Sequence, residues 1–235
     1  MANVTAVIFD FYETLVQLDH DMRERAFDEV ARAAGAELPP GEAYRHWREL
    51  TPDWSLSHQR PPLDGPAPVF RSFQDFWLER SRDLFRRWRV DAPPELGAEA
   101  YARAHAQAEV YPDAAGTIDA LRGRCSLAVL SDADTGFLVD CLAHNRLAFD
   151  VVVSSEDVGA YKPHVAMFRE VCARLDVAPA QAVYVGDSPW ADIAGARNAG
   201  LRAVWLNRHA RPWPGDIEPP ETVITSLAEL ASVLG

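Results

Sequence analysis

The sequence predicts an α/β protein in which a Rossmann-like parallel sheet carries an inserted α-helical cap domain. Two observations predict this fold class. Short apolar runs of strand length alternate with amphipathic segments of helix length, which is typical of βα units and a parallel sheet. The alternation stops between Leu15 and about Tyr111, where the chain is instead rich in Ala, Arg, Glu and aromatic residues. A helical insertion into the sheet domain explains the interruption.

Five runs are expected to be buried strands, because they are apolar and mostly β-branched and end at polar residues or glycine. They are VTAVIF (4–9), SLAVL (126–130), DVVV (150–153), AVYV (182–185) and RAVWL (202–206). In an open parallel sheet, ligands bind outside the carboxyl ends of the strands. Three of these ends carry Asp10, Ser131–Asp132 and Gly186–Asp187, so a site is predicted at this edge.

The insertion is predicted to span residues 17–108, which leaves residues 1–16 and 109–235 as the core. Its expected helices cover 21–35, 41–51, about 70–89 and 97–108, with the Pro-rich segment 61–68 as a loop. The chain crosses between the two parts near Val16–Asp19 and near Val110–Asp113. Residues 208–220 are predicted to be a Pro-rich surface loop before a last helix at 226–234.

Composition limits the classes of function. The 235 residues have an apolar content of 48% and a net charge of −12, which disfavours binding to nucleic acid or to an anionic membrane. A small anionic substrate is compatible with a locally basic site. No run approaches the ~20 apolar residues of a membrane span. The three scattered cysteines fit neither a disulfide framework nor a zinc site, and they favour a reducing cytoplasm. Both a monomer and a homodimer are compatible with the sequence.

Three positions near the strand ends carry candidate chemistry. Asp10, in VIFDFYETL, is a nucleophile or a metal ligand, or else a carboxylate that caps a turn. Ser131, in LAVLSDAD, can hydrogen-bond a substrate oxygen, although Ser-Asp is also a common helix start. Lys162 precedes Pro163 in an extended approach to a helix starting near Pro163. It is either a solvated surface lysine or a group that projects its ammonium toward the strand ends, and the second is favoured because the other basic residues are almost all arginine.

The segment VYVGDSPWADIAGARNAG (183–200) is the most specific of the motifs. Gly186 allows a turn after the strand, and Asp187 and Asp192 are separated by five positions across the entry to a helix. With Asp10 opposite them, these carboxylates form an oxygen-rich pocket suited to Mg²⁺.

Taken together, these motifs resemble the haloacid dehalogenase (HAD) superfamily in order, spacing and strand-end placement, and the resemblance covers the whole chain. It implies that Asp10 attacks the electrophile and forms a covalent aspartyl intermediate that water hydrolyses. It implies that Lys162 and Ser131 stabilise the transferred group. Asp10, Asp187 and the main-chain carbonyl of Tyr12 would hold Mg²⁺, with Asp192 in support.

The chain also departs from the phosphatase pattern. Tyr12 stands where phosphatases of the superfamily carry an acid/base Asp, and a phenol with a pKa of ~10 is a poor base at neutral pH. Glu13, where glycine is usual, is either a substitute for that Asp or a surface-facing turn residue. Asp132 replaces the usual Asn and adds negative charge near the expected substrate.

Tyr12 resembles the 2-haloacid dehalogenase branch, as does HWRELTPDW (46–54), in which Arg48 matches an arginine for the leaving halide. Four aromatic residues line an apolar pocket for the substrate or form the core of the cap: Trp47, Trp54, Phe73 and Trp77. Asp187 and Pro189 argue against the dehalogenase branch, since that branch has Ser and Asn at these positions and binds no metal.

Three functions therefore compete. The preferred one is Mg²⁺-dependent hydrolysis of a small phosphate monoester, because the carboxylate cluster would be costly without a cation. Its expected substrate contacts come from Ser131, Asp132, Lys162 and Arg48. The alternatives are a metal-independent 2-haloacid dehalogenase and a catalytically weak member retained for binding.

Overall fold

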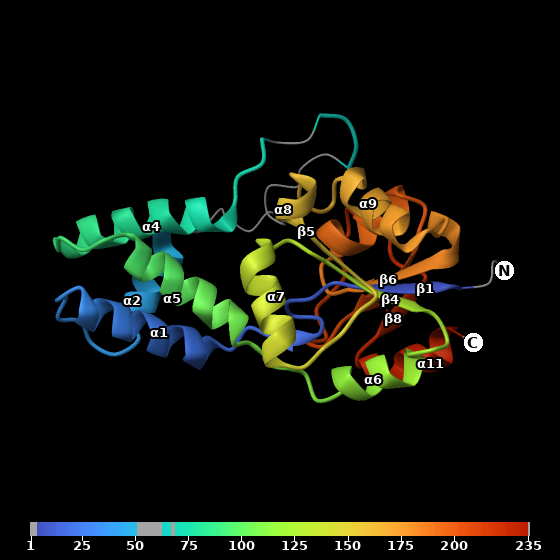
Figure 1. The fold of residues 1–235 in the computed structure, drawn as a ribbon, viewed down its shortest axis with the longest axis horizontal. Coiled ribbons are helices and arrows are strands. Elements are labelled where there is room, and N and C mark those ends of the chain that lie inside the picture. The colour runs from blue at the N-terminus through green and yellow to red at the C-terminus, as the bar shows by residue number, and fades with distance from the viewer. Residues whose placement is uncertain (1–3, 51–62, 67–68, 235) are drawn as a thin grey trace.

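The computed structural model describes residues 4–50, 63–66 and 69–234. Its centre is a six-stranded parallel sheet in the order β5-β4-β1-β6-β7-β8. Helices lie above and below this sheet in the view of Figure 1. The strands are β1 (Ala6–Phe9), β4 (Ser126–Ser131), β5 (Val151–Ser154), β6 (Ala182–Gly186), β7 (Arg202–Leu206) and β8 (Thr222–Ile224). All five predicted strands are confirmed. The edge strand β8 was not predicted, because three residues are too few to show a periodic pattern.

Alternate residues of the central strand β1 point to opposite faces of the sheet, as the pleat requires. Val7 and Phe9 belong to a core shared with α6 (Ala114–Leu121), α7 (Thr135–His144) and α11 (Leu230–Leu234). Ala6 and Ile8 belong to a second core with α9 (Val165–Leu175) and α10 (Gly195–Asn198), at whose edge α8 (Ser155–Val158) lies. Helices on both faces confirm the Rossmann-like α/β class.

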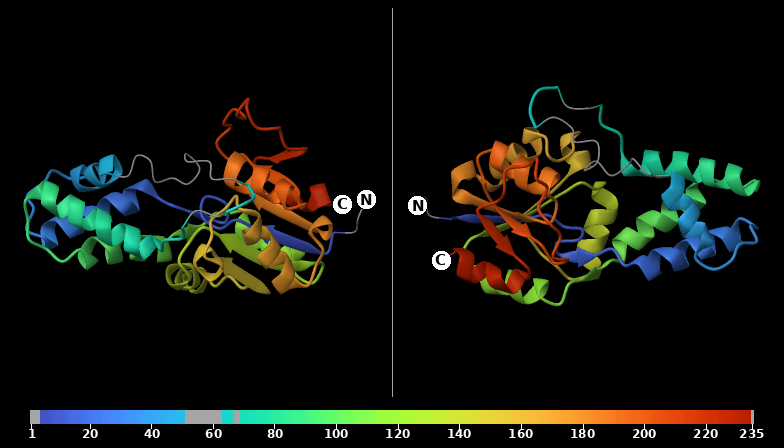
Figure 2. Two further views of the ribbon diagram at one scale, coloured as in Figure 1. Left: turned by 90° about the horizontal axis from the view of Figure 1, so that it is seen from above. Right: turned by 180° about the vertical axis from the view of Figure 1, so that it is seen from behind.

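The described residues of the cap form the helices α1 (His20–Ala33), α2 (Glu42–Leu50), α4 (Phe73–Trp88) and α5 (Glu95–Ala106). They start and end within a few residues of the predicted bounds. Helix α1 begins where the Asp19 side chain accepts a hydrogen bond from the Met22 amide, and the chain leaves it at Gly35 with φ of 76°. The cap helices project from one end of the sheet in both views of Figure 2. Helix α5 packs against α1, α4 and the core helix α7.

The chain enters and leaves the cap through two short strands that pair with each other. Strand β2 (Val16–Gln17) runs antiparallel to β3 (Glu109–Val110), and they hold the two crossings side by side. The predicted boundaries near residues 16 and 109 fall at this ribbon. The division of the chain into two domains remains a prediction. No helix among the described ranges is long and apolar enough to cross a membrane.

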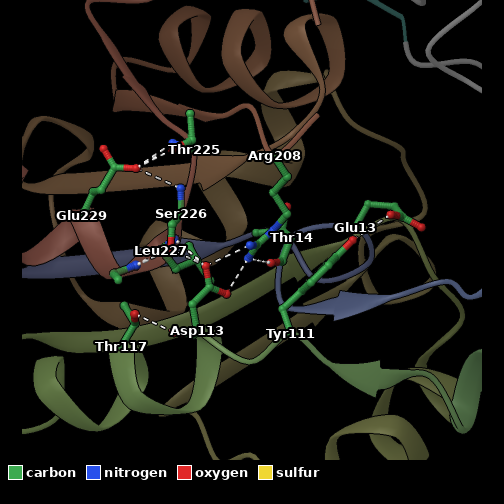
Figure 3. A network of polar contacts seen from close by, with 11 residues as sticks. Glu13, Thr14, Tyr111, Asp113, Thr117, Arg208, Thr225, Ser226, Leu227 and Glu229 are labelled. Carbon is green, nitrogen blue, oxygen red and sulfur yellow. Dashed lines mark hydrogen bonds and ion pairs between the residues drawn. The ribbon is translucent and has the colours of Figure 1, made fainter. Parts of the chain in front are cut away.

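A polar network joins these crossings to the C-terminal part of the chain (Figure 3). The guanidinium of Arg208 donates to both oxygens of Asp113 at 2.9 Å and to the carbonyl oxygen of Thr14 at 2.9 Å. It also lies 4.0 Å from the ring centroid of Tyr111. Asp113 further accepts hydrogen bonds from Ser226. The prediction of a surface loop at 208–220 is therefore wrong at its first residue, because this ion pair draws Arg208 inward.

Candidate active site

Asp10 lies directly beyond the carboxyl end of β1. Its amide donates to the carbonyl oxygen of Val185 at 2.9 Å, so the sheet ladder fixes its backbone. The residue is only 5% exposed. Its side chain lines a cavity of about 580 Å³ between the sheet edge and the cap helices. The tight hold on the main chain presents the carboxylate in one position, as a nucleophile requires.

Lys162 lies at the centre of the carboxylates. Its Nζ atom is 2.6 Å from Oδ1 of Asp10, 2.7 Å from Oδ1 of Asp192 and 3.1 Å from the hydroxyl of Tyr184. The side chain is buried, and burial alone would lower its pKa. The two carboxylates instead raise the pKa of Lys162 well above its usual range, so the ammonium is charged at neutral pH. The helix after it begins at Val165 rather than at Pro163.

Asp132 acts on the main chain that carries this lysine. One of its oxygens, Oδ1, accepts a hydrogen bond from the Lys162 amide at 2.9 Å. Burial raises the pKa of Asp132 to about 6, and Lys162 opposes the rise. Asp132 and the buried Ser131 both line the cavity, as their predicted contact with substrate requires. The hydrogen bond shows that Asp132 also orients the segment before Pro163.

Asp192 is held from three sides. Besides Lys162, its carboxylate accepts hydrogen bonds from the Tyr184 hydroxyl at 2.9 Å and from the Ser188 amide at 2.9 Å. A Cβ atom on Gly186 would lie 2.4 Å from Cγ of Asp192. Residue 186 must therefore be glycine to leave room for this carboxylate, which is a different reason from the turn expected from the sequence.

Asp187 lies at the mouth of the site and pairs with a residue that the sequence did not indicate. Arg211 donates to Oδ2 of Asp187 at 2.8 Å. Asn207 holds the backbone of Arg211 through two hydrogen bonds of 2.8 and 2.9 Å. Trp205 donates from Nε1 to the carbonyl oxygen of Asp187 at 2.9 Å. The loop after β7 is thus built to keep an arginine over this carboxylate.

The predicted metal ligands come together in the structure. Single oxygens of Asp10, Asp187 and Asp192 all lie within 4.8 Å of one another. Oxygen donors at this spacing fit Mg²⁺, which takes carboxylates and waters at about 2.0–2.1 Å in octahedral geometry. The main-chain carbonyl of Tyr12 follows Asp10 by two residues, and no described residue donates a hydrogen bond to it. This donor set fits the ion.

The electrostatics of the cluster favour a cation. Burial raises the pKa of Asp10 to about 8; Lys162 opposes the shift, and Asp192 and Asp187 add to it. Burial and the neighbouring Asp192 also raise the pKa of Asp187 to about 6, against the effect of Arg211. Both shifts mean that the ionised carboxylates repel one another and are poorly solvated. A divalent ion would reverse both effects.

The surroundings of Tyr12 and Glu13 do not favour either residue as the missing acid/base group, and the catalytic role of Tyr12 stays a prediction. Burial raises the pKa of Tyr12 well above its usual range, and its hydroxyl lies 3.5 Å from the carbonyl oxygen of His105. Glu13 adopts φ of 65°, and its carboxylate accepts from the Leu18 amide and the Tyr111 hydroxyl, both at 3.1 Å. It is not among the described residues that line the cavity. Glu13 therefore shapes the turn, and the phenol stays neutral.

The cap contributes an aromatic and basic wall to the cavity. Arg48, Trp47, Phe73 and Trp77 all line it, as expected for a substrate pocket. Trp47 and Trp77 also belong to the core of the cap, so the two roles proposed for them coincide. Trp54 lies outside the described residues. The other described cap residues along the cavity are Arg23, Tyr44, Phe76, Tyr101 and His105.

Among the residues of this site that were missed from the sequence, three contact its charged groups through their side chains or carry charge themselves: Tyr184, Arg23 and Arg211. Tyr184 had a signal, since its hydroxyl is the only polar side-chain group within the otherwise apolar run AVYV. Arg23 also had one, because it lies four positions before Phe27 and so on the buried face of α1. Arg211 had none, since nothing in a Pro-rich loop distinguishes it from an exposed arginine.

Comparison with known proteins agrees with this fold. The chain belongs to the haloacid dehalogenase-like hydrolases, because the model of that family matches residues 4–200. It is 28% identical over 241 residues to (S)-2-haloacid dehalogenase 1 of Pseudomonas sp. (strain CBS-3), covering 100% of this chain and 98% of that protein. It is 30% identical over 227 residues to a glyceraldehyde 3-phosphate phosphatase of Methanopyrus kandleri, covering 87% and 84%.

A solved structure shares the fold along the whole chain. The HAD hydrolase YfnB of Bacillus subtilis, bound to magnesium, superimposes with a TM-score of 0.78 over 99% of both chains at 20% identity. The relatives thus include dehalogenases and phosphatases. The class of hydrolase is established, and its substrate has to be inferred from the site.

Proposed function

We propose that this protein is a Mg²⁺-dependent phosphatase that hydrolyses a small phosphate monoester. The observation that carries the proposal is the convergence of Asp10, Asp187 and Asp192 around one point, with oxygens within 4.8 Å. Lys162 compensates part of this charge, and a divalent cation would compensate the rest. The similarity to a glyceraldehyde 3-phosphate phosphatase and to a magnesium-bound HAD hydrolase supports the proposal.

The chain's own residues define a two-step displacement. Lys162 binds Oδ1 of Asp10, which leaves Oδ2 to attack phosphorus. The bond from phosphorus to the ester oxygen breaks, and the leaving alkoxide or phenoxide takes its proton from solvent water. Water then attacks phosphorus of the aspartyl phosphate, which releases inorganic phosphate and restores the carboxylate. Lys162 and Ser131 face the phosphoryl oxygens in both steps. Bound Mg²⁺ would neutralise phosphoryl charge, held by Asp10, Asp187 and the Tyr12 carbonyl with Asp192 in support.

The neutral phenol of Tyr12 has a consequence for the choice of substrate. General acid catalysis typically contributes about 10²–10⁴-fold to a rate. Without a carboxyl group at residue 12, the leaving oxygen receives little help from a protein acid. Esters of acidic alcohols, such as aryl phosphates, should therefore turn over much faster than alkyl phosphates.

Hydrolysis of 2-haloacids is the second candidate, and two observations favour it. Arg48 lines the same cavity as Tyr12, and Arg211 already compensates Asp187 at 2.8 Å. The similarity to (S)-2-haloacid dehalogenase 1 extends over the whole chain. In this reaction Oδ2 of Asp10 would attack the carbon that carries the halogen. The halide would leave, and water would hydrolyse the resulting ester.

Parallel assays of metal-free protein distinguish the candidates. We expect phosphate release from p-nitrophenyl phosphate only when Mg²⁺ is added. In Asp187→Asn the Mg²⁺ concentration for half-maximal rate should rise at least about tenfold, because a metal ligand is lost. Asp140→Asn, at an exposed position on α7, is the matched control. Halide release from 2-chloropropionate without metal, and no phosphate release, would contradict the phosphatase proposal. Ligand binding without turnover of either compound would indicate a binding protein.

A further inference from the structure

The two ends of the cavity differ in charge. At the sheet edge, the described lining includes the carboxylates of Asp10, Asp132, Asp187 and Asp192 and two cations, Lys162 and Arg211. At the cap end, the described lining includes two arginines, Arg23 and Arg48, and no carboxylate. A bound Mg²⁺ would bring the sheet edge close to neutrality. At the cap end, Arg23 would keep its positive charge, since no described carboxylate lies within ion-pair distance of it.

Arg23 is the better defined of the two cap arginines. Its Nη2 atom donates to the carbonyl oxygen of Leu18 at 2.5 Å, and its Nε atom lies 3.3 Å from the carbonyl oxygen of Asp19. Its guanidinium carbon lies 5.6 Å from the ring centroid of Tyr44. No carboxylate of the described ranges forms an ion pair with Arg23 within 4.0 Å. Main-chain carbonyls therefore orient the cation without neutralising it.

Arg48 lies near the same phenol. Burial and Tyr101 raise the pKa of Tyr44, and both Arg23 and Arg48 oppose the rise. In the structure, Arg23 lies over the ring of Tyr44, and Arg48 follows Tyr44 by one turn of α2 and lines the same cavity. A guanidinium in this position binds a carboxylate or a phosphate better than it binds a halide, because its planar donors match two oxygens.

A continuous wall of rings connects this cationic end to the nucleophile. Tyr12 lies 5.3 Å from His105 between ring centroids, and His105 lies 4.6 Å from Tyr101. Tyr101 also contacts Trp77 at 5.1 Å. A ligand that reaches from Asp10 to Arg23 would run along these rings. The volume of about 580 Å³ is large enough for such a molecule.

We propose that Arg23 and Arg48 form an anion subsite, and that the substrate is a phosphate monoester whose apolar body carries a second anionic group. The second group is a carboxylate or a phosphate, since both offer the paired oxygens that guanidinium groups bind. This inference rests on the proposed phosphatase function, because the first phosphate is the one placed at Asp10.

The test compares aryl phosphates that differ only at the far end of the ring. 4-Carboxyphenyl phosphate and benzene-1,4-diol bisphosphate carry a second anion, and 4-carbamoylphenyl phosphate is the neutral analogue. We expect kcat/KM to be about 10–100-fold higher for an anionic ester than for the neutral one, as for one charge-assisted hydrogen bond or more. We divide kcat/KM of each anionic ester by kcat/KM of the neutral ester. The anion with the larger ratio identifies the second group.

Substitutions in α1 test whether Arg23 causes the preference for an anionic ester. Arg23→Gln should reduce the ratio at least tenfold, by the loss of the charge-assisted hydrogen bonds. Arg23→Lys should restore part of it, because it keeps the charge. Arg25→Gln, two positions away and exposed, is the control. If Arg23→Gln fails to fold, the ratio in the unmodified protein still decides. Equal kcat/KM for the three esters would overturn the subsite and leave the phosphatase proposal intact.

If no ester is hydrolysed, the phosphatase proposal fails by itself. Calorimetric binding of 4-carboxybenzylphosphonate against 4-carbamoylbenzylphosphonate, both with Mg²⁺, then decides the subsite separately. Tighter binding of the carboxylate, reduced in Arg23→Gln, supports it. Equal affinities, or no binding of either compound, overturn it.

Discussion

The two walls of the cavity are built from different kinds of structure. The sheet edge places Asp10, Asp132 and Asp187 just beyond the ends of three strands, each tied by main-chain hydrogen bonds or a fixed register. The cap wall consists of side chains from four helices, placed by how those helices pack. A sheet determines positions through its ladder, whereas helix packing depends on every side chain in the interface. We therefore expect the chemistry to depend on the sheet edge and the selection of substrate to depend on the cap wall.

The two walls also differ in how much stability the fold should lose when a charged residue is removed. At the sheet edge, Lys162 is buried between carboxylates, and removing either partner would leave a charge unpaired in a dry site. At the cap wall, the arginines are oriented by carbonyl groups or lie at the surface, so their loss should be better tolerated by the fold. Changes on the two walls should accordingly differ in kind as well as in size.

The largest effect should follow from Asp10→Asn. The amide cannot act as the nucleophile, so turnover should fall by about 10⁴-fold or more with every substrate. Steady-state rates and trapping of a covalent intermediate measure this. Asp140→Asn should retain activity. A variant that still turns over aryl phosphate at a tenth of the normal rate would show that the sheet edge does not carry the chemistry.

Lys162→Met should be the most destabilising single change at the sheet edge. It leaves Asp10 and Asp192 without their shared cation, and breaking a buried pair typically costs about 3–5 kcal/mol. Denaturant unfolding gives the free energy of unfolding. Arg174→Met, which breaks exposed pairs on α9, should cost no more than about 1 kcal/mol. Equal losses in the two variants would mean that the buried cluster adds no special stability.

Arg48→Met sharpens the distinction between the two candidate reactions. For a phosphatase, we expect KM for aryl phosphates to rise by about tenfold or less, since the arginine lies on the cap wall. For a dehalogenase, the same change should abolish halide release, because the leaving ion would lose its cation. Arg45→Met, also exposed and on the same helix, is the control. Kinetics with both substrates decide between the two outcomes.

The smallest effect concerns the network that joins both parts of the chain (Figure 3). Burial acts to raise the pKa of Asp113. The hydrogen bonds from Arg208, Ser226 and the Leu227 amide outweigh this effect and hold the pKa below its usual value of 3.8. A lowered pKa stabilises the fold above that value, and the contribution is lost as the pH falls through the pKa of the folded state. Asp113→Asn should therefore lower the free energy of unfolding by about 1–3 kcal/mol at pH 7.

The difference in the free energy of unfolding between Asp113→Asn and the unmodified protein should shrink as the pH falls below 4. In this range the carboxyl group of the unmodified protein becomes protonated and loses its charge, like the uncharged amide of the variant. Chemical unfolding followed from pH 7 to pH 3 measures it. Asp119→Asn, whose side chain is 78% exposed on α6, should show no such trend. A constant difference across this range would exclude the ion pair as the cause.

The sequence by itself determined five strands of the parallel sheet, the described cap helices and the sheet-edge residues Asp10, Ser131, Lys162, Asp187 and Asp192. The physical reason is that buried strands need continuous apolar runs, and a parallel sheet brings their carboxyl ends to one edge. Residues that act there can be recognised from position alone. Glu13 shows the limit of this approach, since its neighbours at Leu18 and Tyr111 decided that it shapes a turn.

Only the tertiary structure decided what faces those residues. Arg211 reaches Asp187 because Asn207 folds its loop back onto the site, and no local pattern encodes that contact. Arg23 becomes part of the cavity because α1 and α5 pack side by side, which brings it to Tyr101 and to the rings beyond. Such contacts depend on pairs of residues that lie far apart in the chain. Their energies are decided by packing and burial, which a single sequence does not reveal.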